Sequence, residues 1–140
     1  MNFKKLSPEA IAPTRATPGS AGIDFYSPKD VWIANGATVL ISTQIAVEIP
    51  PGHVGLFCSR SGLAAKQQIF VLNSPGIIDE DYRGELIAIL TNVGEFGYCI
   101  KKGDRVAQLL IVPVNYVTLD EVKELGSTER NTGGLGSTGK

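Results

Sequence analysis

The segment from Asn73 to Glu85 gathers several side chains that could take part in chemistry. It reads Asn-Ser-Pro-Gly-Ile-Ile-Asp-Glu-Asp-Tyr-Arg-Gly-Glu, with three acidic residues around one tyrosine. Pro75-Gly76 is a turn signal, and apolar runs lie on both sides of the segment, at 69–72 and 86–90. Two apolar runs joined through such a turn predict a β-hairpin. This hairpin would hold carboxylates and an aromatic ring on a rigid support, where a small molecule could be bound and attacked.

A second segment, Ser59–Gln68, combines hydroxyls and a guanidinium with a short run of good helix formers. Residues Leu63–Gln68 form the predicted helix, which is too short to persist without tertiary packing. Ser-Arg-Ser-Gly at its start would place hydroxyls, Arg60 and free backbone N–H groups where a phosphate could bind. The alternative is an ordinary Ser N-cap with an exposed arginine, and the segment taken alone favours that alternative.

The C-terminal stretch, residues 126–140, changes composition sharply toward Gly, Ser and Thr, with Leu135 as its one apolar residue. Such a stretch cannot bury enough surface to fold by itself. It is either a flexible end or a lid that orders on a ligand, since Gly-rich backbone, hydroxyls and Arg130 could all bind phosphates. It is not a P-loop, because no Gly-Lys-Ser/Thr follows the glycines.

The rest of the chain consists of short apolar or alternating runs between Gly and Pro turns. These runs predict strands at 23–26, 31–33, 38–49, 53–58, 95–100 and 106–114. Asn35-Gly36 is a strong hairpin signal, and polar–apolar alternation predicts that 116–125 closes the packed part of the chain. Many short strands and almost no helix indicate an all-β single domain, a barrel or jelly roll with one short helix and a flexible tail.

Two polar residues stand out within the predicted strands. Asp24 lies in the middle of its strand, where it is either an edge decoration or an inward-facing group, and composition does not decide between them. Gln108 interrupts a strongly apolar strand, so its amide must find hydrogen-bond partners or face a cavity.

Length and composition restrict the classes of protein further. The chain has 140 residues, 43% of them hydrophobic and 19% charged, which is typical of one globular domain. We expect residues 1–125 to form that domain and 126–140 to form the tail. The net charge of -1 gives no bulk attraction to nucleic acid or to an anionic membrane.

The chain shows no long apolar stretch and no signal-peptide pattern, so we expect an intracellular, cytoplasmic protein. Cys58 and Cys99 lie in apolar segments and are expected to be buried, reduced thiols. His53, the single histidine, lies beside a turn and is expected to be a surface or cap residue.

Five separated segments resemble, in order, the motifs of the trimeric dUTP pyrophosphatases (dUTPases). They are Ala21–Ser27, Arg60–Ala64, Gly76–Gly84, Gly103–Gln108 and Arg130–Thr138. One Gly-rich match would be weak evidence, but five in order over nearly the full chain are hard to reach by chance. The resemblance implies a β jelly roll that assembles as a homotrimer with active sites at the subunit contacts. One subunit would supply motifs one, two and four, a neighbour motif three, and the third subunit its tail.

The reaction that the resemblance implies is hydrolysis of dUTP to dUMP and pyrophosphate. It would limit uracil incorporation into DNA and supply dUMP for dTMP synthesis. Asp79 would be the general base that holds the water attacking the α-phosphorus, where positioning and charge stabilisation dominate. Asp24 would help to organise the water shell or Asp79. Mg²⁺ would be bound chiefly by the substrate phosphates and water, with no direct protein ligand.

The resemblance also implies how the nucleoside would be bound. Asn73 and backbone groups from Gly76 to Ile78 would bind the uracil edge. Tyr82 would pack under the deoxyribose and leave no room for a 2′-hydroxyl. A rigid wall of this kind can discriminate strongly against added atoms.

For the phosphates, the implied contacts come from Arg60, Ser61 and Gly62, with Gln108 at the α-phosphate. The tail would add Arg130, Leu135, Gly136, Ser137 and Thr138. Leu135 stands where the family usually has an aromatic residue that stacks on uracil, so we expect a looser lid with activity retained. Ser59 stands where proline is common, at no implied contact.

Three alternatives remain open from the sequence. A dCTP deaminase shares the implied fold, but it would need a glutamate against the cytosine ring and usually a longer chain. A dUTPase-like regulator acting through protein partners would be favoured by loss of Asp79, which is present. A purely structural jelly roll leaves the polar motifs unexplained.

Overall fold

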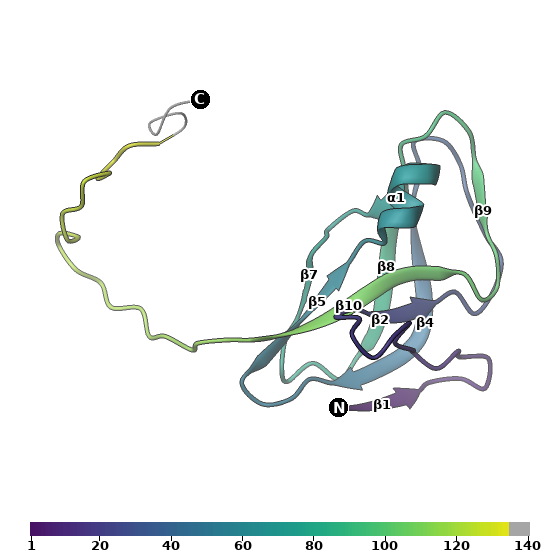
Figure 1. Ribbon diagram of the computed structural model, residues 1–140, viewed down its shortest axis with the longest axis horizontal. Coiled ribbons are helices and arrows are strands. Elements are labelled where there is room, and N and C mark those ends of the chain that lie inside the picture. The colour runs from purple at the N-terminus through teal and green to yellow at the C-terminus, as the bar shows by residue number, and fades with distance from the viewer. Residues whose placement is uncertain (135–140) are drawn as a thin grey trace.

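The computed structural model describes residues 1–134 and shows a body of β-strands from which the C-terminal segment extends (Figure 1). The strands are β1 (Asn2–Lys5), β2 (Ile23–Tyr26), β3 (Val31–Ile33), β4 (Thr38–Glu48), β5 (His53–Cys58), β6 (Ile69–Val71), β7 (Gly76–Ile78), β8 (Glu85–Asn92), β9 (Tyr98–Ile100) and β10 (Arg105–Pro113). The single helix of the described part is α1 (Ser61–Gln67), which begins two residues before the predicted one. The fold is the expected all-β jelly roll with one short helix.

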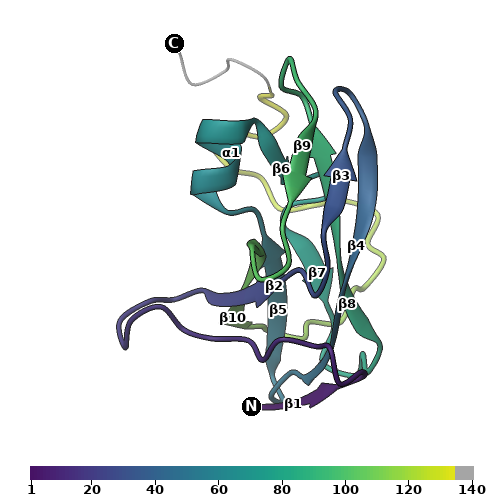
Figure 2. The same ribbon diagram turned by 90° about the vertical axis from the view of Figure 1, so that its right-hand side faces the viewer.

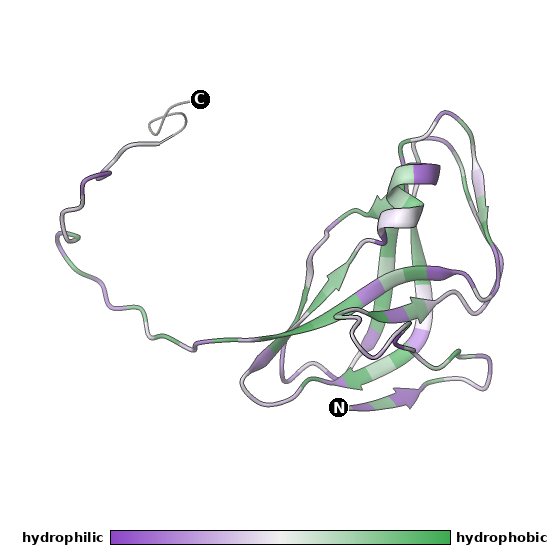
Figure 3. Ribbon diagram, viewed as in Figure 1, coloured by the Kyte–Doolittle hydropathy of each residue, from purple (hydrophilic) through white to green (hydrophobic). Residues whose placement is uncertain are grey.

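Two four-stranded sheets, ordered β1-β4-β8-β6 and β2-β10-β5-β7, enclose the core, and β3 and β9 form a small third sheet (Figure 2). Buried apolar residues of both large sheets form one core cluster. Much of the ribbon of these strands is hydrophobic (Figure 3). Phe25 of β2 and Phe57 of β5 pack edge to face, with ring centroids 5.3 Å apart. This geometry is favourable for aromatic pairs, and it holds β2 and β5 on either side of β10.

The predicted hairpin around residues 73–85 is confirmed in its flanks, because β6 pairs antiparallel with β8. Its middle differs from a simple hairpin. Residues Gly76–Ile78 form β7, which crosses to the other sheet and pairs with β5. The segment therefore joins the two sheets, and Asp79 follows the last residue of this crossing strand.

The hairpin predicted at Asn35-Gly36 is wrong, although Gly36 does turn with a φ of 71°. The strand before the turn pairs with β9, and β4 pairs with β1 and β8. Asn92 explains why β3 and β4 do not pair with each other, since its backbone exchanges hydrogen bonds with Gly36 and Ala37 at 2.9 and 3.0 Å. The buried Asn92 side chain also donates to the Ile33 carbonyl at 3.2 Å, so tertiary partners override the local signal.

The stretch expected to close the domain, 116–125, is instead exposed and contains no helix or strand. Val117 and Leu119 are 76% and 95% exposed. Polar–apolar alternation buries one face of a segment only where another surface meets it, and this single chain presents none there. The packed part ends with β10, and the chain then runs away from the body (Figure 1).

The remaining expectations concern isolated residues. Cys58 and Cys99 are free thiols but only half-buried, and burial raises the pKa of Cys58. The His53 ring hydrogen-bonds the Pro51 carbonyl beside its turn, at 2.9 Å from Nδ1. Between residues 1 and 134, no helix is long and apolar enough to cross a membrane.

Gly55 provides a test of the packing between β5, β7 and β10. A Cβ at this position would lie 2.9 Å from Ile49 Cδ1 and 3.1 Å from Ile78 Cβ. We expect Gly55→Ala to lower the free energy of unfolding by about 1–3 kcal/mol because the core is overpacked, measured by urea denaturation at fixed protein concentration. Gly19→Ala is the control, since its Cβ would meet no atom within 4 Å; equal stability of the two variants would contradict this packing.

Candidate active site

One group of predicted site residues lines a hollow beside the start of α1. The cavity measures about 390 Å³ and is lined by Ala16, Ser20, Ala21, Gly22, Asp24, Arg60, Gln108 and Leu110. These residues come from the loop before β2, from β2 and β10, and from the residue preceding α1. The first, second and fourth motif segments therefore meet at one place.

Asp24 is an inward-facing group, which settles the alternative left open by the sequence. Its side chain is only 4% exposed and forms ion pairs with Arg60 and with Arg105, the latter at 3.3 Å. Burial lowers the pKa of the Arg60 guanidinium, and the positive charge of Arg105 lowers it further. Two guanidiniums on one carboxylate leave positive charge in excess, which favours an anion in the adjoining hollow.

Gln108 finds the partners that its position in an apolar strand requires. It lies opposite Asp24 in the β10–β2 pair, and its Nε2 donates to the Ser59 carbonyl at 2.9 Å. A Cβ on Gly22 would lie 2.3 Å from Gln108 Oε1. The absence of a side chain at Gly22 therefore lets the amide lie at the wall of the hollow.

The start of α1 leaves backbone donors available. Arg60 occupies the N-cap with extended dihedral angles and makes no side-chain cap hydrogen bond. The first helical bond runs from the Ala64 N–H to the Arg60 carbonyl at 3.0 Å, so the N–H groups of Ser61 and Gly62 have no helical acceptor. The alternative of an ordinary Ser N-cap is wrong, because the Ser59 hydroxyl instead accepts the Val71 N–H at 2.9 Å.

The second group of predicted residues surrounds a separate hollow at the end of β7. This cavity measures about 240 Å³ and is lined by Ile77, Ile78, Asp79, Tyr82, Glu85, Leu86 and Ile87. Asp79 is exposed, and its carbonyl accepts the Tyr82 N–H at 3.1 Å in a tight turn. The turn therefore presents a carboxylate and an aromatic ring toward the same space.

The position of the Tyr82 ring depends on Gly84. The Tyr82 hydroxyl donates to the Glu85 carbonyl at 3.1 Å, and the ring lies so close to Gly84 that a Cβ there would be 2.5 Å from Cζ. A similar relation holds at the other end of the segment, where a Cβ on the buried Gly76 would be 3.0 Å from Asn73 Nδ2. The two glycines thus set where the neighbouring side chains lie.

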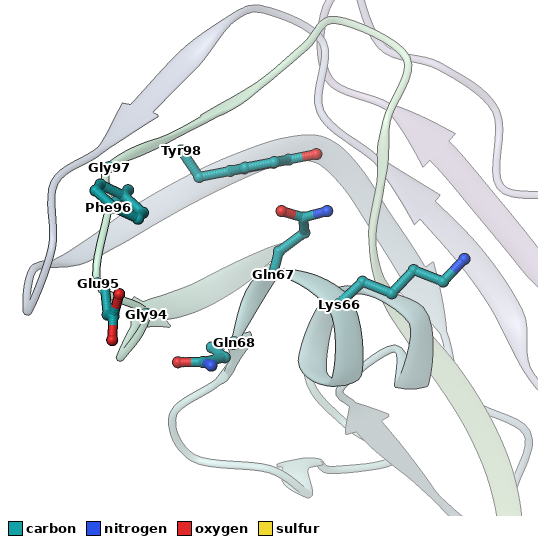
Figure 4. Close-up of a pocket in the computed structure, with 8 residues that line it drawn as sticks. All are labelled: Lys66, Gln67, Gln68, Gly94, Glu95, Phe96, Gly97 and Tyr98. Atoms are coloured by element: carbon teal, nitrogen blue, oxygen red, sulfur yellow. The ribbon is translucent and has the colours of Figure 1, made fainter.

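The two hollows have no lining residue in common, so a single chain brings the predicted residues together in two groups and not in one. Arg130 lies in the extended segment, where its Nε donates to the Gly133 carbonyl at 3.0 Å. Leu135, Gly136, Ser137 and Thr138 lie outside the described residues. A further hollow between the end of α1 and residues 94–98 contains none of the predicted residues (Figure 4).

Sequence reasoning missed the roles of Arg105, Gly22 and Gly84. Each lies within a segment that was already singled out, two or three residues from one with an assigned role. Arg105 was visible in the sequence as an arginine near the start of a strand, but only the register of β2 against β10 places it on Asp24. The contacts of Gly22 with Gln108 and of Gly84 with Tyr82 appear only in the folded structure.

An all-β domain with a cationic hollow and a separate carboxylate-bearing turn has the features of a protein that binds an anionic ligand, such as one bearing phosphates. A family model described as dUTPase matches residues 8–139. The chain belongs to the dUTPase family.

Relatives and solved structures agree with this assignment. The chain is 48% identical over 137 residues to a deoxyuridine 5'-triphosphate nucleotidohydrolase of Hydrogenobaculum sp. (strain Y04AAS1), covering 97% of this chain and 95% of that protein. The Staphylococcus bacteriophage 80alpha dUTPase with dUPNHPP has a TM-score of 0.92 at 33% identity, covering 99% and 98% of the two chains. A dUTPase from phage phi11 of S. aureus, described with a structural Mg(II) ion, has a TM-score of 0.83 at 30% identity and covers 90% and 98%.

The ion pairs of Asp24 generate a prediction about stability. Asp24→Asn would leave the guanidiniums of Arg60 and Arg105 without their shared anion. We expect the free energy of unfolding to fall by about 2–4 kcal/mol, less than for a fully buried group because solvent screens Arg105. Asp30→Asn is the control, since Asp30 pairs with Lys101 at the exposed surface. Chemical denaturation that gives both variants the same stability would contradict this role.

Proposed function

We propose that this chain hydrolyses dUTP to dUMP and pyrophosphate. The observation that carries the proposal is the exposed Asp79 carboxylate, which shares a hollow with the Tyr82 ring at the end of β7. The relatives named above are dUTP nucleotidohydrolases, and the phage 80alpha relative was solved with a dUTP analogue. A free nucleotide substrate would place the reaction inside the cell.

In the proposed reaction Asp79 is the general base. It would accept a proton from a water molecule whose oxygen attacks the α-phosphorus. The bond from that phosphorus to the oxygen bridging to the β-phosphate would break, and pyrophosphate would leave. Positioning of the water supplies much of the rate enhancement in such a step, and the turn closed by the Tyr82 N–H supports that positioning.

The triphosphate would bind in the cationic hollow. Arg60, the N–H groups of Ser61 and Gly62, and the Gln108 amide are the proposed contacts. Asp24 is a supporting residue in this scheme: it holds Arg60 in place, while Arg105 supplies a second cation to the same carboxylate. Charge-assisted contacts of this type bind phosphate strongly.

The nucleoside would bind at the second hollow. Asn73 and the backbone of Gly76 to Ile78 are the proposed contacts to uracil. The Tyr82 ring would lie under the deoxyribose, held by its hydrogen bond to the Glu85 carbonyl and by contact with Gly84. A ring fixed in this way supports rejection of a 2′-hydroxyl.

The proposed cofactor is Mg²⁺, held by the three phosphates and water. Asp24 is already occupied by two guanidiniums, and residues 1–134 contain no group of three His, Cys, Asp or Glu side chains placed to hold an ion. The proposal rests on the usual chemistry of Mg²⁺, which keeps several waters and binds through substrate phosphates. When bound, the ion would neutralise part of the phosphate charge.

A homotrimer is proposed because the two hollows are separate and an apolar face adjoins one of them. We define the apolar face as Leu40, Leu72, Ile77, Ile87 and Ile89. Leu40 lies opposite Ile89 across β4 and β8 and is 70% exposed, and the Leu72 N–H donates to the Ile89 carbonyl at 2.8 Å. Ile77 and Ile87 also line the hollow of Asp79. A second copy covering this face could bring its cationic hollow to Asp79.

Residues 126–140 are proposed to complete the site of a third copy. Arg130 would reach the γ-phosphate end, with Leu135, Gly136, Ser137 and Thr138 covering the nucleotide. The exposed stretch 115–125 is long enough to carry the tail away from its own domain. A segment without a core of its own can order when ligand binds.

The substrate assignment is tested with purified protein and Mg²⁺. We expect pyrophosphate release from dUTP and little from dTTP, UTP or dCTP, and no release from dUTP would refute the function. Asp79→Asn should lower kcat by about 10²-fold or more, the scale of a lost general base. Asp81→Asn, in the same turn but outside the hollow that Asp79 shares with Tyr82, is the control, and full turnover by Asp79→Asn would exclude the base role.

A substitution at Gly84 tests whether the Tyr82 ring sets the selectivity against a 2′-hydroxyl. Gly84→Ala should push the Tyr82 ring from its place, since the added Cβ would be 2.5 Å from Cζ. We expect the ratio of kcat/KM for dUTP over UTP to fall by about tenfold, a loss of roughly 1.4 kcal/mol of discrimination. Gly19→Ala, where an added Cβ meets no atom within 4 Å and which lines neither hollow, is the control. An unchanged ratio would show that Tyr82 does not set sugar selectivity.

The trimer is tested by its mass in solution. Sedimentation should give three times the chain mass, and Leu40→Glu should shift the protein to smaller species and abolish turnover, because a buried charge destabilises the interface. Phe96→Glu, at a residue 80% exposed and outside the apolar face, should remain trimeric. A fully active monomer would overturn the shared-site arrangement.

A further inference from the structure

The carboxylate of Glu80 joins three segments that are distant in sequence. Its Oε2 accepts the Gly52 N–H at 2.7 Å and the Tyr116 hydroxyl at 2.9 Å. Glu80 directly follows Asp79, and Tyr116 lies just beyond the end of β10. One side chain therefore connects the turn of the proposed base with the point where the C-terminal segment leaves the domain.

Neighbouring contacts hold this junction in place. The Val114 N–H donates to the Gly52 carbonyl at 2.9 Å, so Gly52 contacts both the end of β10 and Glu80. The Arg83 guanidinium donates to the Glu80 carbonyl at 2.6 Å. The backbone and the side chain of Glu80 are thus both held, and the Tyr116 hydroxyl meets a fixed acceptor.

Tyr116 is the last residue in the described part of the chain that contacts the body through a hydrogen bond or ion pair. Later hydrogen bonds, as far as residue 134, join only residues within 128–133. Val117 and Leu119 are exposed. The direction in which the tail departs is therefore set at Tyr116.

The protonation states of Glu80 and Tyr116 favour the hydrogen bond between them. The Gly52 N–H and then the Tyr116 hydroxyl lower the pKa of Glu80, and the Glu80 carboxylate raises the pKa of Tyr116. At neutral pH the acceptor is therefore charged and the donor keeps its proton. Hydrogen bonds to charged acceptors are stronger than those between neutral groups.

We propose that Tyr116 is a positioning residue, whose hydrogen bond to Glu80 fixes the exit of the tail relative to the turn of Asp79. Because the tail would close on nucleotide bound at another copy, this contact, the Tyr116–Glu80 anchor, determines how readily the tail reaches that nucleotide. The inference rests on the proposed function.

The test is Tyr116→Phe in the full-length protein, which removes only the hydroxyl. We expect KM for dUTP to rise about three- to tenfold, the scale of one net hydrogen bond at an exposed site. The change in kcat should be less than about twofold, because saturating substrate closes the tail and only binding is lost. Tyr98→Phe is the matched control, at a tyrosine of β9 that lines the hollow at the end of α1 (Figure 4) and not the one lined by Glu80 and Tyr116.

A double-mutant cycle separates positioning from a local structural effect. In an Arg130→Ala background, where the proposed phosphate contact of the tail is already gone, Tyr116→Phe should raise KM less than twofold. Glu80→Gln keeps an acceptor and should give a KM between those of the wild type and Tyr116→Phe. An equal KM effect of Tyr116→Phe in both backgrounds, or a loss confined to kcat, would overturn the inference.

A titration without nucleotide tests the anchor apart from catalysis. The pKa of Tyr116, followed by NMR of its ring carbons, should fall in Glu80→Gln, and an unchanged pKa would refute the hydrogen bond. If the wild type hydrolyses dUTP and Tyr116→Phe matches it, the anchor inference alone fails. If the wild type releases no pyrophosphate from dUTP, the proposed function fails, while the titration still decides whether the anchor exists.

Discussion

A buried carboxylate shared by two arginines is the interaction on which the cationic hollow depends. Asp24 is nearly inaccessible to solvent, and a lone carboxylate at such a position would be costly. Arg60 and Arg105 reach it from different segments, so the pairing holds the residue before α1 against β2 and β10. The same contacts keep a guanidinium at the wall of a cavity that Gln108 also lines. The ion pairs that neutralise the buried carboxylate therefore also place a guanidinium where an anion could bind.

The crossing of the chain between the two sheets has a comparable consequence. Because β7 pairs with β5 while its flanks pair with each other, the residues after Ile78 are carried to the edge of the body. Asp79 and Tyr82 are exposed there, beside an apolar face and away from the cationic hollow. The separation of these two groups within one chain is the physical basis of the proposal that the active site forms between copies.

Part of the fold and site could be predicted because the signals are local. The β6–β8 pairing followed from two apolar runs, and the need of Gln108 for partners followed from its apolar surroundings. The hairpin at Asn35-Gly36 failed because Asn92, far away in sequence, binds the turn from β8. The expected packing of 116–125 failed because alternation states which face would be buried and not which surface would bury it.

The sequence by itself determined the all-β class, the short helix, the Gly-rich tail and the set of polar segments whose order matches the dUTPase family. These features depend on residue types and short spacings, which local sterics and burial patterns translate directly into structure. Only the tertiary structure decided that Asp24 faces inward and pairs with Arg105. It also decided that the Tyr82 ring packs against Gly84 and that the Tyr116 hydroxyl donates to Glu80. Those contacts depend on strand register and on the meeting of distant segments, where a shift of one residue would turn each side chain to the opposite face.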